Sequence, residues 1–242
     1  MAHKSKIEWT ESTWNPITGC DKISAGCENC YAFRLAQRLQ KMGNAKYING
    51  FKLTLHDSCL NDPYSWKKPM LIFVNSMSDL LHKDVPLDYI QKIFDVMNSN
   101  PHHVFQVLTK RADRLEEIST QVNWSENIWL GVTVENDICK SRIKYLRRMP
   151  AKIKFISFEP LLSDVGVLDL SGIDWTIVGG ESGWKARPMQ EEWVINIKEQ
   201  CEQQNVLFYF KQWGGVNKKK TGRILLERTW DDMPFTKLAA YI

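Results

Sequence analysis

The sequence of 242 residues lacks the long apolar run of a membrane protein and the leader of a secreted one. No segment approaches the ~20 consecutive apolar residues that a membrane-spanning helix needs. The opening residues, MAHKSKIEWTESTW, contain no apolar core of the kind found in secretory signals. These two absences predict a cytoplasmic protein without a membrane partner.

A fourth cysteine is missing from the place where three others cluster. Cys20, Cys27 and Cys30 lie within eleven positions, with gaps of six and two residues. Structural disulfides are rare in a reducing compartment, so clustered thiols favour a metal site or catalysis. Structural zinc needs four ligands, and His56 or Cys59 would then supply the fourth. Three thiolates alone can instead hold an iron–sulfur cluster that leaves one iron open to a small molecule.

No proline-rich linker divides the chain, and from residue 69 onward apolar strands alternate with amphipathic helices. We expect strands over 14–19, 70–79, 103–111, 128–136, 153–160, 175–183 and 206–215, with 51–57 as an optional eighth. We expect helices over 31–42, 86–100, 136–149 and 189–204. This repetition predicts an α/β fold, a partial or complete parallel (β/α) barrel, with a doubly wound open sheet as the alternative. Residues 1–242 are expected to form a single domain, with 211–242 as a C-terminal extension packed on or near the barrel mouth.

Polar side chains follow the predicted strands at the points where they end. The strand-end residues are Asn75, Ser76, Asp79, Thr109, Lys110, Arg111, Thr133, Glu135, Glu159, Glu181, Ser182, Lys211 and Gln212. Because α/β barrels build their sites at the C-terminal ends of the strands, these residues are expected to share one face with the cysteine loop. His102 and His103 precede a strand and are expected at the opposite face.

Several motifs are spread over nearly the whole chain: TWNPITGCDKISAGCENCYA, VLTKRADRL, ISFEPLL, IVGGESG, FYFKQWGG and RTWDDMP. They are similar to a phage- and prophage-associated, radical-SAM-like family of unknown function, the three-Cys-motif proteins. The cysteine loop resembles that of the radical S-adenosylmethionine (SAM) enzymes, whose usual spacing is C-x3-C-x2-C, often with an aromatic residue next, as Tyr31 is here. The first gap departs from this pattern. VLTKR is similar to a strand end of the spore photoproduct lyase branch, which repairs thymine lesions in DNA.

This resemblance implies a [4Fe–4S] cluster ligated by Cys20, Cys27 and Cys30, with SAM bound through its amino and carboxylate groups at the open iron. One-electron cleavage of SAM would release a 5′-deoxyadenosyl radical that abstracts hydrogen from the substrate. The resemblance also implies an electron donor of the flavodoxin or ferredoxin type. Lys110 is predicted to bind the SAM carboxylate and, with Glu181, to be catalytic.

The predicted cofactor-binding residues are Asn75, Ser76, Lys110, Glu135, Glu159 and Glu181. The substrate is expected to be a nucleic acid or nucleotide, which the net charge of +4 permits without requiring. Two alternatives stay open. One is a zinc- or cluster-stabilised nucleic-acid-binding module without turnover, and the other is a non-radical barrel enzyme whose cysteines only brace its first loop.

Overall fold

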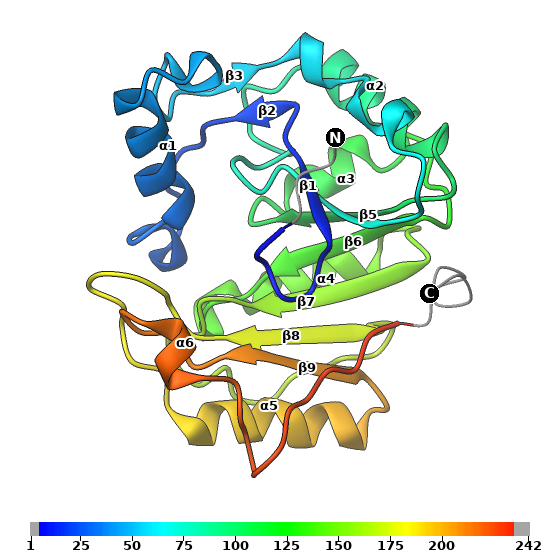
Figure 1. The fold of residues 1–242 in the computed structure, drawn as a ribbon. Coiled ribbons are helices and arrows are strands. Elements are labelled where there is room, and N and C mark those ends of the chain that lie inside the picture. Colours follow the sequence, from blue (N-terminus) through cyan, green and yellow to red (C-terminus); the bar gives the residue numbers. More distant parts are fainter. Residues whose placement is uncertain (1–4, 235–242) are drawn as a thin grey trace.

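A curled parallel sheet runs through the centre of the molecule (Figure 1). The computed structural model describes residues 5–234, and within them seven strands form this sheet in the order β1, β4, β5, β6, β7, β8, β9. Their bounds are β1 Ser12–Trp14, β4 Leu71–Val74, β5 Val104–Thr109, β6 Ile128–Thr133, β7 Ile153–Phe158, β8 Trp175–Gly179 and β9 Leu207–Gln212. All neighbours pair in parallel. A doubly wound sheet would reverse its strand order at a switch point, so the predicted partial barrel is confirmed and the open-sheet alternative is not.

Helices cover the outer surface of the curl. The α-helices are α1 Tyr31–Lys41, α2 Leu87–Asn98, α3 Arg114–Ile118, α4 Ser141–Arg147, α5 Glu191–Gln203 and α6 Lys218–Thr221. Short 3-10 turns are η1 Ala25–Cys27, η2 Ala45–Tyr47, η3 Asp57–Cys59, η4 Asp62–Ser65 and η5 Asp137–Lys140. Helix α2 buries Ile90, Ile93, Phe94 and Met97, the side chains that a spacing of three and four residues places on one face. None of the described helices is long and apolar enough to cross a membrane.

The predicted first strand, residues 14–19, is wrong in its bounds. Strand β1 ends at Trp14, and Ile17 and Thr18 form the separate strand β2 (Ile17–Thr18), which pairs antiparallel with β3 (Thr54–Leu55). Pro16 has no N–H to donate to a ladder, and the Ile17 amide donates to the side chain of Asn75 at 3.2 Å instead. Residues 51–57 therefore do not add an eighth strand to the described sheet.

Inside the curl, an aromatic layer lies beneath the strand ends. The layer consists of residues that pack together in one buried cluster: Trp9, Trp129, Phe155, Trp175 and Tyr209. Trp9 and Trp175 meet edge to face with ring centroids 6.4 Å apart. Alternate residues of a strand share a face. The residues two positions further along each strand therefore form the next interior layer, nearer the C-terminal ends of the strands. The aromatic layer closes the interior toward the N-terminal ends of the strands.

The chain after β9 covers the sheet edge and meets the strand ends. The Phe210 amide donates to the Trp230 carbonyl at 2.9 Å, so the returning segment lies along β9. The Gly183 amide donates to the Gly215 carbonyl at 2.9 Å, which ties the segment directly after β9 to the loop after β8. Residues 235–242 of the predicted C-terminal extension lie outside the described residues.

Candidate functional site

A cavity of about 430 Å³ opens at the C-terminal ends of the strands. In Figure 1 the arrowheads of β6, β8 and β9 point toward this end, on the side where α1 lies. Most of the predicted site residues line the cavity, namely Cys20, Cys27, Cys30, Asn75, Ser76, Lys110, Glu159 and Glu181. Glu135 does not line it. The fold therefore brings together residues that are spread along the chain from Cys20 to Glu181.

The three cysteines of the loop are all free thiols and partly exposed. Burial, together with the nearby Asp79 carboxylate, raises the pKa of Cys20 to about 11. The three sulfur atoms do not all lie within 4.8 Å of one another. Four sulfurs around one tetrahedral zinc, with Zn–S bonds of about 2.3 Å, would lie about 3.8 Å apart. In a cluster each thiolate binds a different iron, so three thiolates can hold a cluster without meeting at one ion.

The fourth zinc ligand predicted as an alternative is not at the cavity. His56 hydrogen-bonds to the Thr18 hydroxyl at 2.7 Å, and the Cys59 sulfur accepts from the Lys46 ammonium at 3.2 Å. Neither residue lines the cavity that the three clustered cysteines share. Among the described residues, the cavity is therefore lined by three thiols without a histidine or a fourth cysteine.

Glu135 holds the cysteine loop from outside the cavity. Its buried carboxylate accepts a hydrogen bond from the Ser24 hydroxyl and pairs with Arg142 at 2.7 Å. At Gly26 a side chain would begin 2.5 Å from this carboxylate, so a larger residue there would displace the Glu135 side chain. Burial alone would raise the pKa of Glu135, but Lys110 and Arg142 outweigh it and hold this pKa below its ordinary value. The predicted cofactor-binding role of Glu135 has no support in this geometry, because the carboxylate faces the loop and Arg142.

Glu181 lines the cavity, yet both of its oxygens are already engaged. One oxygen accepts from the Arg187 Nε and amide and from the Asn29 side chain, each at 2.9 Å, and the other pairs with Arg187 at 2.5 Å. Arg187 also donates to the Ala25 carbonyl at 2.9 Å. Burial opposes ionisation, but these hydrogen bonds keep the pKa of Glu181 below its ordinary value. In this structure Glu181 therefore positions Arg187 and the cysteine loop.

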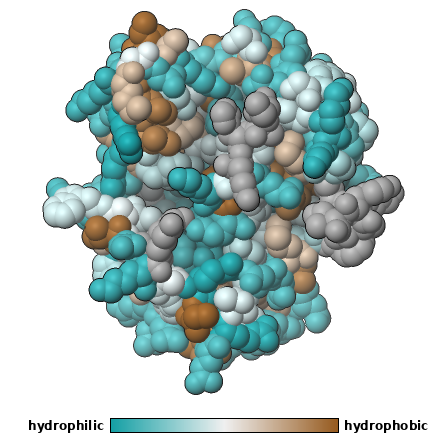
Figure 2. Space-filling view, viewed as in Figure 1, coloured by the Kyte–Doolittle hydropathy of each residue, from teal (hydrophilic) through white to brown (hydrophobic). Residues whose placement is uncertain are grey.

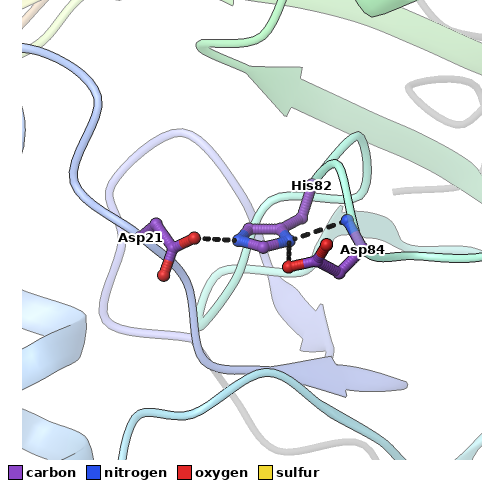
Figure 3. A group of neighbouring side chains, drawn as sticks. All are labelled: Asp21, His82 and Asp84. Carbon is purple, nitrogen blue, oxygen red and sulfur yellow. Dashed lines mark hydrogen bonds and ion pairs between the residues drawn. The ribbon is translucent and has the colours of Figure 1, made fainter.

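A third contact secures the loop directly after Cys20. The Asp21 carboxylate lies 3.1 Å from Nε2 of His82, and Asp84 lies 3.7 Å from Nδ1 of the same ring. Figure 3 shows the imidazole between the two carboxylates, with one on each ring nitrogen. The ligand atoms of the three residues lie within 4.8 Å of one another, but both aspartates are exposed and they approach opposite ring nitrogens. This group instead ties the loop to the segment after β4.

Two lysines line the cavity, but only one of them forms an ion pair within the described residues. The Lys211 ammonium pairs with Glu159 at 2.7 Å, and Glu159 also accepts from the Trp9 indole at 3.2 Å. The Lys110 amide donates to Asp79 at 3.1 Å. Within residues 5–234 the Lys110 ammonium has no hydrogen-bond or ion-pair partner. The charge of Lys110 acts on Glu135 without a direct ion pair, so its ammonium is available to pair with an anion in the cavity.

Asn75 adds an unused donor to the same wall. Its backbone is in the left-handed region, with φ of 58°, and its Oδ1 accepts from the Ile17 amide. Its buried Nδ2 has no partner among the described residues. Beside it, the Tyr31 hydroxyl donates to the Ser76 carbonyl at 2.5 Å, and the Ser76 hydroxyl donates to Asn15 at 3.1 Å. The Asn75 amide is therefore available to an acceptor on a bound ligand.

Comparison with known proteins agrees with this architecture. The family model described as "Protein of unknown function (DUF5131)" matches residues 4–234. The chain belongs to this family. None of the curated proteins matches the chain.

Among solved structures, the DUF5131 chain is similar to spore photoproduct lyases. One mutant form shares 11% identity with a TM-score of 0.55, and the match covers 87% of this chain and 78% of the lyase chain. A second mutant form shares 12% identity with a TM-score of 0.54, and the match covers 88% of this chain and 79% of the lyase chain. A third structure, complexed with dinucleoside spore photoproduct, has 11% identity and a TM-score of 0.50, and this chain spans only 64% of its length. At these identities the likeness shows the fold, the curled parallel half-barrel of radical-SAM neighbours.

Two residues that hold the DUF5131 site together were not predicted. Arg187 and Ser24 hold the loop. Asp79 and Arg111 are expected at strand ends, and the structure adds their contacts: Asp79 orients the end of β5, and a guanidinium nitrogen of Arg111 lies 3.9 Å from the Cys20 sulfur. The roles of Ser24 and Arg187 depend on contacts between distant segments, for which the sequence carries no local signal.

Proposed function

We propose that this DUF5131 protein is a radical-SAM-like enzyme that holds a [4Fe–4S] cluster on Cys20, Cys27 and Cys30 and binds SAM beside it. The observation that carries the proposal is that three free thiols and the unpaired ammonium of Lys110 line one cavity at the C-terminal end of a parallel half-barrel. The similarity in fold to spore photoproduct lyases supports it.

The cluster and SAM, when bound, supply the radical chemistry that the sequence resemblance implies, including the 5′-deoxyadenosyl radical. The chain supplies binding and orientation. Lys110 binds a carboxylate by charge and hydrogen bonding, and the Asn75 Nδ2 donates to an acceptor. Trp9, Phe73 and Leu108 line the cavity with apolar surface that excludes water from the reacting groups.

The substrate proposed for this site is a nucleic acid or a nucleotide. One of the spore photoproduct lyase structures that resemble the chain is complexed with dinucleoside spore photoproduct. The net charge of +4 and the isoelectric point near 8.6 are compatible with a phosphate-bearing substrate. A phage or prophage origin is part of the same proposal, and it rests on the sequence motifs alone.

Metal analysis after anaerobic reconstitution with iron and sulfide tests the proposal. The wild-type protein should bind about four irons per chain, the number in the proposed cluster type. Cys20→Ala, Cys27→Ala and Cys30→Ala should each abolish the cluster. Cys139→Ala and Cys201→Ala are matched controls that should retain it, because these two buried thiols lie away from the cavity lining. Stoichiometric zinc without iron uptake would overturn the proposal.

Cleavage of SAM separates an enzyme from a cluster-stabilised binding module. Cluster-loaded protein reduced with dithionite should change its electron paramagnetic resonance spectrum on addition of SAM and slowly form 5′-deoxyadenosine. Protein that retains its cluster but neither binds nor cleaves SAM would contradict the radical reaction and leave the binding-module alternative.

A further inference from the structure

The loops that follow β8 and β9 lie side by side at the mouth of the strand-end cavity. These two segments, here named the mouth loops, comprise residues 182–190 and 213–226. The Gly183 amide of the first donates to the Gly215 carbonyl of the second at 2.9 Å. At Gly180 and Gly214 a side chain would overlap the backbone of the neighbouring segment, so glycine permits this close approach. The two Gly-Gly motifs of the sequence thus join the mouth loops into one rim, drawn in yellow and orange beneath α1 in Figure 1.

An exposed tryptophan belongs to the first mouth loop. Ser182 lines the cavity, and the Lys185 carbonyl accepts from the side chain of Asn29, another lining residue, at 3.1 Å. Trp184 lies between these two anchored positions and is 72% exposed. An indole that is mostly in solvent leaves a face on which a planar ligand group can stack.

The mouth loops also carry positive charge. They contain six basic residues and no aspartate or glutamate, and the basic residues are Lys185, Arg187, Lys218, Lys219, Lys220 and Arg223. Carboxylates of neighbouring segments pair with the two arginines: Glu181 and Glu28 with Arg187, and Asp231 with Arg223. Lys185 and Lys220 are exposed, and neither forms an ion pair within residues 5–234. Arg34 of α1 adds a further positive charge, because its guanidinium lies beside Gly183.

Aromatic, apolar and charged side chains are therefore mixed at this rim. Figure 2 shows pale and brown side chains among teal ones at the left edge of the molecule, where Figure 1 places the loop after β8. Proteins that bind single-stranded nucleic acids combine aromatic side chains, on which bases stack, with positive charge along the backbone of the strand. In a duplex the faces of the bases are covered by their neighbours, and an enzyme that acts on a base must take it out of the stack.

We propose that the mouth loops bind a single-stranded nucleic acid, in which one base stacks on Trp184 while Lys185 and Lys220 contact phosphates. The inference rests on the proposed function and deepens it, because it chooses a polymer over a free nucleotide and an unpaired strand over a duplex. The cavity of about 430 Å³ is small within the range of ligand pockets, roughly 300–1,000 Å³. Only a short part of a strand can enter it beside SAM, and the rest of the strand lies across the rim.

A protein is the competing occupant, because Val216 and Ile224 of the second mouth loop are 71% and 56% exposed. Lysine, however, is depleted at protein–protein interfaces. The mouth loops contain four lysines, which match the phosphates of a nucleic acid. The charge of the rim therefore favours the strand.

Fluorescence anisotropy with a labelled single-stranded DNA and a labelled single-stranded RNA, each of about 12 nucleotides, tests the proposal. The full-length protein is titrated after cluster reconstitution, at several salt concentrations. The wild type should bind at least one of the two strands, with an affinity that falls as salt rises. Trp184→Ala should weaken binding roughly 5- to 150-fold, the range for the loss of one stacked base, and Trp184→Phe should retain most of the affinity.

The lysines are tested through the salt dependence. Each phosphate contact to a single strand contributes about 0.7 to the slope of log affinity against log salt, so Lys185→Ala/Lys220→Ala should make the slope shallower by roughly 1.4. The matched controls are Tyr64→Ala and Lys67→Ala/Lys68→Ala. They change exposed residues that precede β4, at the other end of the half-barrel, and should bind as the wild type does.

Four results would show that the mouth-loop proposal is wrong. They are binding of neither strand by the wild type, unchanged binding by Trp184→Ala and the lysine variant, competition by a mononucleotide as effective as that by the strand, and binding of a duplex as tight as that of either strand. If sedimentation instead shows that the wild type self-associates and Trp184→Ala does not, while neither strand binds, the rim docks a second copy of the chain and the proposal is equally wrong.

Iron content and SAM cleavage, measured on the same preparations, separate this proposal from the proposed function. A protein that cleaves SAM and binds neither strand keeps the radical function and overturns the mouth-loop proposal. A protein that takes up no iron, yet binds a strand in a way that depends on Trp184, contradicts the radical function and supports the mouth-loop site.

Discussion

Of the two lysines that line the cavity, Lys110 makes no direct ion pair within the described residues, although its charge helps to lower the pKa of Glu135. Asp79 accepts from its amide at 3.1 Å and from the Thr109 hydroxyl at 2.8 Å, so the buried carboxylate fixes the end of β5 while leaving the ammonium free. Lys211, by contrast, is neutralised by Glu159 at 2.7 Å. An incoming carboxylate is thus expected to pair with Lys110.

Replacing Lys110 with alanine should weaken SAM binding by roughly 1.5–3 kcal/mol, the range for a hydrogen bond to a charged group, or roughly 10- to 150-fold in Kd. Calorimetric titration of cluster-loaded protein with SAM measures this. The iron content should not change, because Lys110 is not a thiol ligand. Lys110→Arg keeps the charge and should recover part of the affinity. Unchanged affinity in Lys110→Ala would assign the carboxylate to another group.

The cysteine loop is the element in which this chain departs from radical-SAM enzymes. Its first gap has six residues, and the structure holds this longer loop through contacts from three strand ends. His82 follows β4 and contacts Asp21, Glu135 follows β6 and accepts from Ser24, and Glu181 follows β8 and binds Arg187 and Asn29. Three strand ends of the barrel therefore hold the loop through direct side-chain contacts.

Glu135→Gln should lower the free energy of unfolding of the metal-free protein by about 3 kcal/mol, because it leaves the partly buried Arg142 without its counter-ion. It should also speed amide hydrogen exchange in residues 21–27. Glu116→Gln is the matched control: Glu116 pairs with Arg148 on the exposed surface, where such a pair contributes less than about 1 kcal/mol. Equal effects of the two variants, measured by urea unfolding and exchange mass spectrometry, would show that Glu135 does not organise the loop.

At the scale of the whole molecule, the two ends of the half-barrel have opposite character. The C-terminal end carries the cavity into which the strand-end polar side chains point, and the N-terminal end is closed by packed apolar and aromatic groups. His103 precedes β5 and is fully buried between Trp66 and Phe105, with ring centroids 6.0 Å away on each side. It does not line the strand-end cavity, in agreement with the prediction that it lies away from the cysteines.

Stability should depend on pH through this histidine. Burial, with the neighbouring His102, lowers the pKa of His103 from 6.5 to about 4. The unfolded chain therefore takes up a proton at a higher pH than the folded one, and stability falls as the pH drops from about 6.5 to about 4. The loss across this interval should be about 3 kcal/mol. Urea unfolding of the metal-free protein at pH 7, 5.5 and 4.5 measures it, and His103→Gln should flatten the decline; an equally steep decline in the variant would contradict this assignment.

The repeated strand–helix pattern could be recognised from the sequence because it depends on local periodicity. Residues 103–111 and 128–136 are near-continuous apolar runs of the kind that a covered parallel sheet requires, and they form β5 and β6. The four predicted helices appear at their expected places, the one over 136–149 as η5 and α4. Strand ends of parallel strands meet at one edge, so the position of the cavity also followed from the pattern.

Only the tertiary structure decided which polar groups are free and which are engaged. Glu135 and Glu181 look alike in sequence as strand-end carboxylates, but Glu135 lies outside the cavity against Arg142, and Glu181 lies within it with both oxygens on Arg187 and Asn29. Likewise, residues 14–19 split into two strands because the Ile17 amide bonds to Asn75, 58 positions away. Local sequence patterns report which face a side chain occupies, whereas its partners come from segments that only the folded chain brings together.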